Sequence, residues 1–452
     1  MMLYLLGGMA TVLTLLGFLV PARVSRMLSL ATLVAGIAYL ARTWGEPASL
    51  FGGLYRVDSL AQGFTLVALL GVLWFLLAAR SDKFEFPLFG LYAALGMHVM
   101  ASSNNLVVML LGLEVFSLPL YLLATWRRDE AGFEAGLKYF LLGALSSAVF
   151  IYGIALHFGA TGSFEAGTQG QGILFASGLL LVMAALAFKV AMVPFHWWAP
   201  DVYQGSPTSV SLLMATAVKA AAFAALLRVL AQENMDVWGL ALTLLVALTV
   251  LIGNLGALAQ NEAKRLLAYS SIAHAGYTAL ALFSPTGAPA VGFYLLTYLL
   301  GTGLAFAVLQ QISERDVPYA ALRGLIYRKP LLGVALGLAL FSLAGLPPLV
   351  GFWGKYLVFL EAAKAGQYGL VVLALLTSAV AAYYYLKLFS LVVMQKPAGA
   401  PGQDLAATSL DEARLPRLST SSSARFAIVV ATILLVILGL VPGWAFRVFI
   451  AG

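Results

Sequence analysis

The chain has 452 residues, of which 62% are hydrophobic and only 10% are charged, and its mean hydropathy is +0.95. Soluble globular chains carry about 25% charged residues, so the composition excludes a soluble protein and predicts an all-α integral membrane protein. The sequence has no cysteine, which excludes disulfides, thiol redox chemistry and cysteine-ligated iron–sulfur clusters, and its net charge of +7 suits basic membrane loops better than nucleic-acid binding.

Apolar runs that are long enough to cross a membrane recur along the whole chain. A crossing helix takes about 20 apolar residues, and the sequence contains about fourteen such runs. We expect the helices at residues 2–20, 27–41, 59–79, 86–103, 105–126, 138–160, 172–199, 208–231, 237–260, 265–283, 289–312, 331–363, 368–394 and 425–449. The first run lacks the basic start and the cleavage site of a signal peptide, so it is expected to remain as a helix.

Basic residues are distributed unevenly between the loops. Sixteen Arg and Lys residues follow odd-numbered helices, whereas three follow even-numbered helices. By the positive-inside rule, this predicts a multi-pass protein of the bacterial inner membrane with both termini on the outer face. Lys138, Arg228 and Arg447 lie near the ends of apolar runs, where their long side chains are expected to reach the membrane surface.

Two of the predicted helices are unusually long and contain proline. Pro194 lies near the end of 172–199, and Pro347 and Pro348 lie in the middle of 331–363. Proline removes a backbone donor and clashes with the preceding turn, and the freed carbonyls must find partners in protein or water. We therefore expect two broken helices that face the protein interior.

The positions of the two breaks suggest a division of the chain into repeats. Each break is fourth in a set of five helices, and two consecutive sets of five enter the membrane from opposite sides. The predicted parts are residues 1–85 with three helices, the inverted repeats 86–231 and 237–394, and residues 425–452 with the last helix. Broken helices at matching positions point to a transport site, although proline kinks are also common in membrane helices without this role.

Four ionisable residues are expected at mid-membrane depth, on four different helices. They are Glu114, Lys189 before the first break, Lys219 among alanines, and Lys355 after the second break. A charge at the bilayer centre costs at least ~2.5 kcal/mol, so it persists where it is paired or hydrated. One glutamate cannot form ion pairs with three lysines. Burial disfavours the charged form of a lysine, whereas a nearby carboxylate stabilises it. Such a row could load and release protons, although any single lysine could also form a structural ion pair.

Other polar residues are weaker candidates for the same path. His274 lies on a similar helical face to Ser270, Ser271 and Tyr277, and either a path residue or a hydrogen-bonded core histidine fits this pattern. Lys387 is placed like Lys219 but closer to a helix end, and His196 could cap the broken helix or belong to the path. The least specific candidates are Thr297, Tyr298 and Thr302. The four histidines are scattered singly, so no metal site is expected.

The candidate residues and their surroundings resemble the antiporter-like subunits of respiratory complex I. The stretches FKVAMVPFHWWAPDVYQGSPTSV, NEAKRLLAYSSIAHAGY and LAGLPPLVGFWGKY are similar to the signature stretches of that family, in the same order. The resemblance covers nearly the whole chain and implies proton translocation through fourteen helices with two inverted repeats. It further implies that Glu114 and Lys189 form a pair, that Lys219 passes the proton across the middle, and that Lys355 delivers it toward the outer face.

The resemblance also implies which cofactors and partners to expect. No cofactor is expected in this chain, whereas NADH, FMN, iron–sulfur clusters and quinone would be handled by partner subunits of a proton-pumping NADH:quinone oxidoreductase. The partners would be other membrane-arm subunits, including further antiporter-like subunits, and the lipid bilayer.

The branch of the family is indicated by one residue and by the length. Lys355 stands where the M-type branch typically has glutamate, and a chain that ends at Gly452 has no room for the lateral helix of the L-type branch, so both features favour the N-type branch. The D-type membrane protein of a multi-component sodium/proton antiporter, or a membrane subunit of a related hydrogenase, shares these features and stays the alternative. A passive scaffold, in which the charges only hold helices together, is a third hypothesis.

Overall fold

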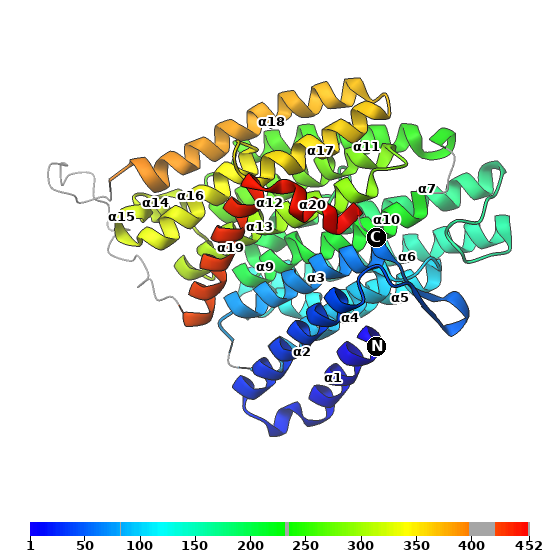
Figure 1. Cartoon of the computed structure of the whole chain (residues 1–452), viewed down its shortest axis with the longest axis horizontal. Coiled ribbons are helices and arrows are strands. Elements are labelled where there is room, and N and C mark those ends of the chain that lie inside the picture. Colours follow the sequence, from blue (N-terminus) through cyan, green and yellow to red (C-terminus); the bar gives the residue numbers. More distant parts are fainter. Residues whose placement is uncertain (82, 231–234, 397–420, 451–452) are drawn as a thin grey trace.

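The structure is a computed structural model that describes residues 1–81, 83–230, 235–396 and 421–450, and it is nearly all helical (Figure 1). Twelve of the described helical runs are long and apolar enough to cross a membrane. The other two predicted crossings are the 17-residue helix α4 (Glu85–Ala101) and the pair α16 (Pro330–Ala344) and α17 (Val350–Lys364). The prediction of an all-α membrane protein is therefore confirmed, while the division into two inverted repeats stays a prediction.

The first part of the chain contains a small β-hairpin that was not predicted. The elements are α1 (Met2–Leu16), η1 (Gly17–Leu19), α2 (Ala22–Arg42), β1 (Ala48–Leu50), η2 (Phe51–Gly53), β2 (Tyr55–Val57) and α3 (Ser59–Ala78). The two strands are antiparallel, with Ser49 opposite Arg56. Gly52 and Gly53 form the turn with φ of 67° and 97°, a conformation that glycine adopts without steric cost.

The middle of the chain differs from prediction in an earlier start of one helix, α6, and in an interruption of another. It contains α5 (Leu106–Ala124), α6 (Glu130–Thr161), α7 (Gly172–Lys189), α8 (Trp198–Gly205), α9 (Thr208–Ala215) and α10 (Ala217–Leu230). The sequence predicted one continuous helix over 208–231, but Thr216 interrupts it with φ −114° and ψ −75°. This interruption lies three residues before Lys219 and carries no proline or glycine that could have announced it.

The remaining elements complete the bundle and its C-terminal end. They are α11 (Met235–Leu258), α12 (Ala263–Ala279), η3 (Leu280–Phe283), α13 (Ala288–Ile312), α14 (Tyr319–Leu322), α15 (Leu325–Arg328), α18 (Tyr368–Phe389), η4 (Ser390–Met394), α19 (Ser422–Leu440) and α20 (Pro442–Ile450). The predicted last helix, 425–449, is divided at Pro442 into α19 and α20. Proline at this position removes the donor that would continue α19.

Both predicted breaks are present. α7 ends at Lys189 and the chain becomes helical again at Trp198, whereas α16 ends at Ala344 and α17 begins at Val350. The peptide bonds Val193–Pro194 and Pro347–Pro348 are cis.

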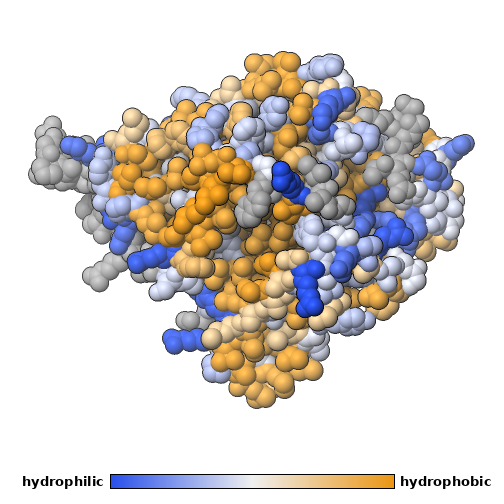
Figure 2. Space-filling model, in the orientation of Figure 1, coloured by the Kyte–Doolittle hydropathy of each residue, from blue (hydrophilic) through white to orange (hydrophobic). Residues whose placement is uncertain are grey.

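The helices differ sharply in how deeply they are buried. All residues of the run Thr208–Leu230 are buried. In 18-residue apolar windows of Ala263–Phe283 and Ala288–Ile312, 94% of the residues are buried, compared with 28% for Met2–Leu19. Figure 2 accordingly shows hydrophobic residues over much of the visible face, including the part formed by α1 and α2. Most polar side chains on α9, α10, α12 and α13 therefore lie in the protein interior.

Close helix packing in this bundle depends on glycine. A Cβ added to Gly96 of α4 would lie 2.5 Å from the backbone nitrogen of Phe116 on α5. Small residues at such crossings allow the backbones of membrane helices to approach, so α5, which carries Glu114, is held directly against α4.

Both ends of the chain lie on the side of the β-hairpin. Met1 lines a cavity together with Ala48 and Tyr55, and Phe449 lies 3.0 Å from the position of a Cβ on Gly63, near the start of α3. α14 and α15 lie at the other end of the bundle (Figure 1). The two termini are thus on one side, as an even number of crossings requires.

Two cations that were expected to reach the membrane surface are held by carboxylates. Arg228 is 8% exposed, and its guanidinium contacts both carboxylate oxygens of Asp58 at 2.7 and 3.0 Å. Lys138 lies two turns inside α6, because this helix begins at Glu130, and its ammonium contacts Glu134 at 2.6 Å and Asp201 at 2.7 Å. These carboxylate partners were not predicted, because they come from distant parts of the chain or from an earlier helix start, and the expectation that both side chains reach the membrane surface stays a prediction.

Candidate functional site

Lys189 is the last residue of α7 and is held by hydroxyls and aromatic rings. Its ammonium donates to Ser117 Oγ at 2.9 Å and to Tyr121 Oη at 3.3 Å, both on α5. Four rings lie 5.5–5.8 Å from the ammonium, a distance at which cation–π attraction operates; they belong to Phe116, Tyr121, Tyr139 and Phe188. With 1% of its surface exposed, Lys189 is therefore enclosed by neutral partners.

Glu114 lies near this site but does not contact the lysine. Its carboxylate accepts a hydrogen bond from Ser147 of α6, and no ion pair within 4.0 Å joins it to Lys189. Ser117, which holds Lys189, lies three residues after Glu114 and hence on the same face of α5. The Lys189 ammonium therefore binds α5 about one helical turn away from Glu114, and the two predicted partners have different serines as hydrogen-bond partners.

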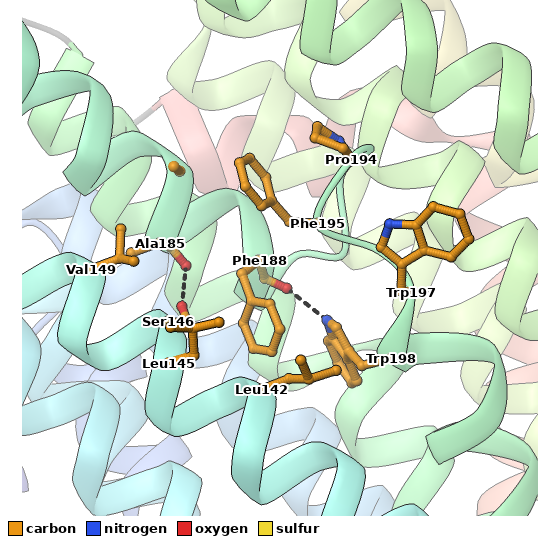
Figure 3. Close-up of a pocket in the computed structure, with 11 residues that line it drawn as sticks. Leu142, Leu145, Ser146, Val149, Ala185, Phe188, Pro194, Phe195, Trp197 and Trp198 are labelled. Carbon is orange, nitrogen blue, oxygen red and sulfur yellow. Dashed lines mark hydrogen bonds between the residues drawn. The ribbon is translucent and has the colours of Figure 1, made fainter.

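The first break borders a mainly apolar cavity of about 200 Å³ (Figure 3). Side chains satisfy two of the carbonyls at the end of α7: Trp198 Nε1 donates to Phe188 O at 3.1 Å, and Ser146 Oγ donates to Ala185 O at 3.2 Å. Such side-chain partners are what a broken membrane helix requires. His196 lies in the loop between α7 and α8, is 5% exposed, and has no hydrogen-bond partner for Nδ1 among the described residues.

Lys219 lies in the fully buried centre of the bundle. It is 1% exposed, and its ammonium donates to the backbone carbonyl of Ser271 on α12. The ring of Tyr298 on α13 lies 5.7 Å from the ammonium. Within the part of the chain that the structure describes, the hydroxyls of Ser271, Tyr298 and Thr302 are buried and have no hydrogen-bond partner. Buried groups of this kind are those that ordered water satisfies.

His274 connects α12 with two neighbouring helices. Its Nδ1 lies 2.8 Å from Tyr294 Oη on α13, and its Nε2 lies 3.2 Å from Tyr385 Oη on α18. The same Tyr385 hydroxyl contacts Ser270. The histidine is thus hydrogen-bonded at both ring nitrogens, between two phenols that can donate or accept a proton.

The side chain of Lys355, on α17, reaches back across the second break to the end of α16. Its ammonium donates to Ala344 O, the last carbonyl of α16, at 3.0 Å and to Ser378 Oγ on α18 at 2.9 Å. Gly345 follows with φ +81°, and a Cβ at this position would lie 2.8 Å from Lys355 Cδ. Glycine is needed here for two independent reasons: the left-handed backbone and the space that the lysine takes.

Four of the predicted candidate residues, Lys219, Tyr298, His274 and Lys355, form one continuous row with Tyr277. Lys219 lies 5.7 Å from the ring of Tyr298, whose centroid is 4.9 Å from the ring of His274. The ring of His274 is 5.7 Å from that of Tyr277, and the ring of Tyr277 is 5.3 Å from the ammonium of Lys355. We refer to Lys219, Tyr298, His274, Tyr277 and Lys355 as the central row. It joins α10, α13, α12 and α17 through the interior.

Other predicted residues lie outside the central row. The hydrogen bonds and ring contacts of Lys189 end at α5, α6 and its own helix. Lys387 is exposed on the last turn of α18, where its ammonium lies 5.8 Å from the ring of Tyr319. The structure therefore brings Lys219, His274 and Lys355 together and leaves Lys189 with Glu114 as a separate site.

The partners that hold these lysines were not singled out from the sequence. Ser117 and Tyr121 could have been found, because they follow Glu114 by three and seven residues and so share its helix face. Ser378 and Tyr385 could not have been found in this way. Both belong to α18, in which the exposed Lys387 is the one basic residue.

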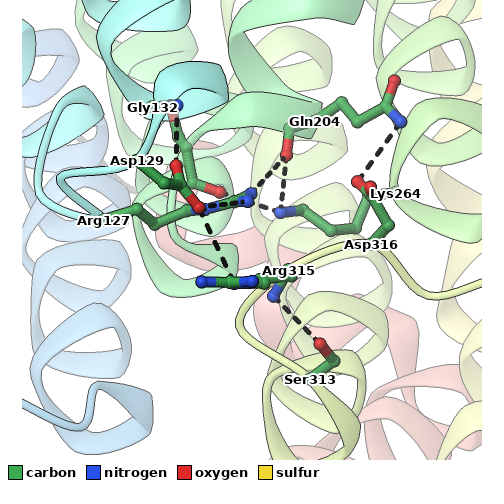
Figure 4. A network of polar contacts seen from close by, with 9 residues as sticks. Arg127, Asp129, Gly132, Gln204, Lys264, Ser313, Arg315 and Asp316 are labelled. Carbon is green, nitrogen blue, oxygen red and sulfur yellow. Dashed lines mark hydrogen bonds and ion pairs between the residues drawn. The ribbon is translucent and has the colours of Figure 1, made fainter.

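A polar network closes the end of the bundle where the basic loops meet (Figure 4). Arg127 and Arg315 contact the Asp129 carboxylate at 2.8 and 3.6 Å, from loops that follow α5 and α13. Burial raises the pKa of the Asp129 carboxyl, but the hydrogen bonds from Arg127 and from the N–H of Gly132 lower it more, so the net pKa lies below its ordinary value. Lys264, near the start of α12, is fully buried beside this network.

The described residues contain no group of three or more His, Asp or Glu side chains that could hold a metal ion. The site therefore consists of lysines, one histidine, tyrosines, hydroxyls and one glutamate, which are groups that exchange protons.

Comparison with known proteins places the chain in a family. Residues 103–381 match the family described as NADH:quinone oxidoreductase/Mrp antiporter, TM. NADH-quinone oxidoreductase subunit 14 of Thermus thermophilus is 56% identical over 452 residues, 100% of both chains, and subunit N of Deinococcus radiodurans is 42% identical over 96% of this chain and 93% of its own. A chain in the structure of respiratory complex I from Thermus thermophilus with bound aureothin has a TM-score of 0.90 at 56% identity, covering 99% of each chain. The chain therefore belongs to the NADH:quinone oxidoreductase/Mrp antiporter family of membrane subunits, as the resemblance of its motifs implied.

Proposed function

We propose that the chain is a proton-translocating membrane-arm subunit of an NADH-quinone oxidoreductase, the respiratory complex I, and that it corresponds to subunit N. The identity of 56% over the whole chain with subunit 14 and of 42% with a subunit N supports the assignment. The branch that was predicted from Lys355 and from the chain length agrees with these names.

The central row is the observation on which the proposed mechanism rests. A buried ammonium without a carboxylate partner is disfavoured relative to the neutral amine, so Lys219 and Lys355 can give up a proton that an exposed lysine would keep. Tyr298, His274 and Tyr277 lie between them at 4.9–5.7 Å. These are distances to ring centroids, and none of the hydrogen bonds of the described residues joins two members of the row directly. This arrangement suits transfer through water, for which the buried hydroxyls of Ser271 and Tyr298 have free capacity.

Lys189 and Glu114 form the control site in this proposal. Both lie on or against one face of α5, and Ser117 holds the lysine one turn away from the carboxylate. Movement of Glu114 toward Lys189 would favour the charged ammonium, and withdrawal would favour proton release. Lysine suits this exchange, whereas arginine stays charged.

The energy source and the orientation complete the proposal. NADH oxidation and quinone reduction belong to partner subunits that carry FMN and iron–sulfur clusters, and the neighbours in the membrane include further antiporter-like subunits. The shared side of both termini is assigned to the outer face, because the basic loops gather at the other end of the bundle.

The D-type membrane protein of a sodium/proton antiporter, or a membrane subunit of a related hydrogenase, stays the alternative function. Direct sodium binding would call for several oxygen ligands and more than one acidic group at depth. Of the four residues assigned to mid-membrane depth, only Glu114 is acidic, so proton transfer is favoured.

The test is proton pumping by the assembled complex in sealed vesicles. Lys219→Ala or Glu114→Ala should abolish pumping by this subunit while the complex still assembles. Lys329→Ala, which changes an exposed lysine outside the site, is the matched control and should pump normally. Normal pumping in both site variants would overturn the proposal and favour a passive scaffold.

A further inference from the structure

The short helix α8 contacts both halves of the site, although it carries none of the residues of the central row. At its N-terminal end, Trp198 Nε1 donates to Phe188 O at 3.1 Å, directly before Lys189. At its C-terminal end, Lys264 of α12 donates to Gln204 O at 2.9 Å and to Ser206 O at 2.8 Å (Figure 4). One eight-residue helix thus touches the helix of Lys189 and the helix of His274.

Asp201 is the residue of α8 that joins two helices through one carboxylate. Its Oδ2 contacts the ammonium of Lys138 on α6 at 2.7 Å, and its Oδ1 contacts Arg265 Nη1 on α12 at 2.8 Å. Arg265 also donates to Gln204 Oε1 at 3.1 Å. Because each oxygen holds a cation from a different helix, the side chain fixes the separation of α6 and α12.

The energetics of this bridge indicate a positional role. The three side chains are 30–39% exposed and line a polar cavity of about 220 Å³. Exposed ion pairs contribute little to stability when isolated and gain value mainly as networks with fixed geometry. We therefore expect Asp201 to fix the relative positions of α6 and α12 and to contribute little to the free energy of folding.

Further contacts extend the link to the helices of Glu114 and Tyr298. Arg127, in the loop after α5, donates to Gln204 O at 3.4 Å. Gln204 Nε2 donates to Asp316 Oδ1 at 3.2 Å, in the loop after α13. Any displacement of α5, α6 or α7 that accompanies a change at the Glu114–Lys189 site is thereby carried to α8, and from α8 to α12.

We propose that Asp201 is a positioning residue that couples the Glu114–Lys189 site to the central row through α8. The proposal rests on the proposed proton-pumping function. α12 supplies both the Ser271 carbonyl that holds Lys219 and the His274 ring, so a shift of α12 alters two members of the row at once. Coupling of this kind requires a rigid, contiguous element between two sites, and α8 with the four cations that contact it is such an element.

The test compares Asp201→Asn with Glu134→Gln in the intact complex. Glu134 is the other carboxylate on Lys138, so Glu134→Gln removes one charge from the same lysine and leaves the bridge to α12 in place. We expect a loss of protons pumped per NADH oxidised in Asp201→Asn, with an unchanged Tm of the complex, and a normal ratio in Glu134→Gln. Asp201→Glu should restore the ratio because it keeps a carboxylate for both cations.

Three results would overturn the proposal: a normal ratio in Asp201→Asn, an equal loss in Glu134→Gln, or a loss with a lowered Tm that Asp201→Glu does not repair. If Asp201→Asn does not assemble, Arg265→Gln carries the same test, because it removes only the contact to α12. A normal ratio in Asp201→Asn together with a loss in Lys219→Ala refutes the coupling alone, whereas normal ratios in both refute the pumping function itself.

Discussion

The two broken helices place their lysines in opposite ways. At the first break, Lys189 ends the helix before the break and reaches two hydroxyls of α5 within a cage of rings. At the second break, Lys355 lies on the helix after the break and caps the carbonyl of Ala344 across it. Both are buried, yet only Lys355 has a ring neighbour, Tyr277, that leads on to His274.

In the proposed mechanism, this difference separates the control site from the conducting row. The hydrogen-bond partners of the Lys189 ammonium lie on α5, and the rings around it continue through Tyr139 to Trp198 of α8. Its single acidic neighbour, Glu114, lies one turn away along α5. The Lys355 site is the end of a continuous row and depends on the backbone geometry of the break. The same sequence pattern, a lysine beside a proline that breaks a helix, therefore corresponds to two different structural arrangements.

The largest expected effect is on the second break. Lys355→Met removes the cap of α16 and the last member of the central row, so it should abolish proton pumping in the assembled complex. Lys364→Met, on the same helix, changes a half-exposed lysine that pairs with Glu361 and should pump normally. Pumping by Lys355→Met at the wild-type rate would show that the row does not end at this residue.

Gly345→Ala should reduce pumping by about tenfold. A left-handed backbone costs a residue with a Cβ roughly 1–2 kcal/mol, and the new atom would lie 2.8 Å from Lys355 Cδ, which displaces the ammonium. Gly366→Ala is a matched control, because Gly366 has φ +77° and a Cβ there would meet nothing within 4 Å. If both variants slow pumping equally, backbone strain alone is responsible and the lysine position is not.

Ser117→Ala should weaken the first site to a smaller extent. It leaves Tyr121 as the one hydrogen-bond partner of the Lys189 ammonium, and the loss of a partner by a buried polar group costs about 1–3 kcal/mol. We expect a several-fold slower proton uptake and a slightly lower Tm of the complex. Ser146→Ala, which removes a hydrogen bond to Ala185 O nearby, should lower the Tm without slowing uptake.

The smallest effect is expected from Tyr298→Phe. The ring contacts to Lys219 and His274 remain, and only a hydroxyl without a partner in the described residues is lost. Uptake should slow by a few-fold at unchanged Tm if that hydroxyl holds water in the row. Trp238→Phe removes another buried donor without a partner, outside the row, and no slowing is expected; equal slowing in both would contradict the assignment.

Much of the membrane architecture and of the lysine set could be predicted from the sequence. Apolar length reveals crossing helices because the bilayer fixes that length, and Pro194 and Pro347 reveal the breaks because proline cannot continue a helix. Lys189, Lys219 and Lys355 stand out because a charge is rare at such depth.

The rest depends on contacts between segments far apart in the chain. Nothing local in the sequence tells that Ser378 and Ala344 hold Lys355, or that Asp58 would bury Arg228. The interruption at Thr216 has no proline or glycine to mark it, and the burial of Lys264 depends on the end of α8. Helical periodicity records which residues share a face, but not which helix that face meets.

The most direct test of the central claim is a high-resolution density map of the intact complex in its native membrane lipids. The account predicts ordered water within hydrogen-bonding distance of Ser271 Oγ, Tyr298 Oη and Thr302 Oγ1, connecting Lys219 to His274 and continuing toward Lys355. Dry, apolar packing around these three hydroxyls, with no water between the two lysines, would contradict it.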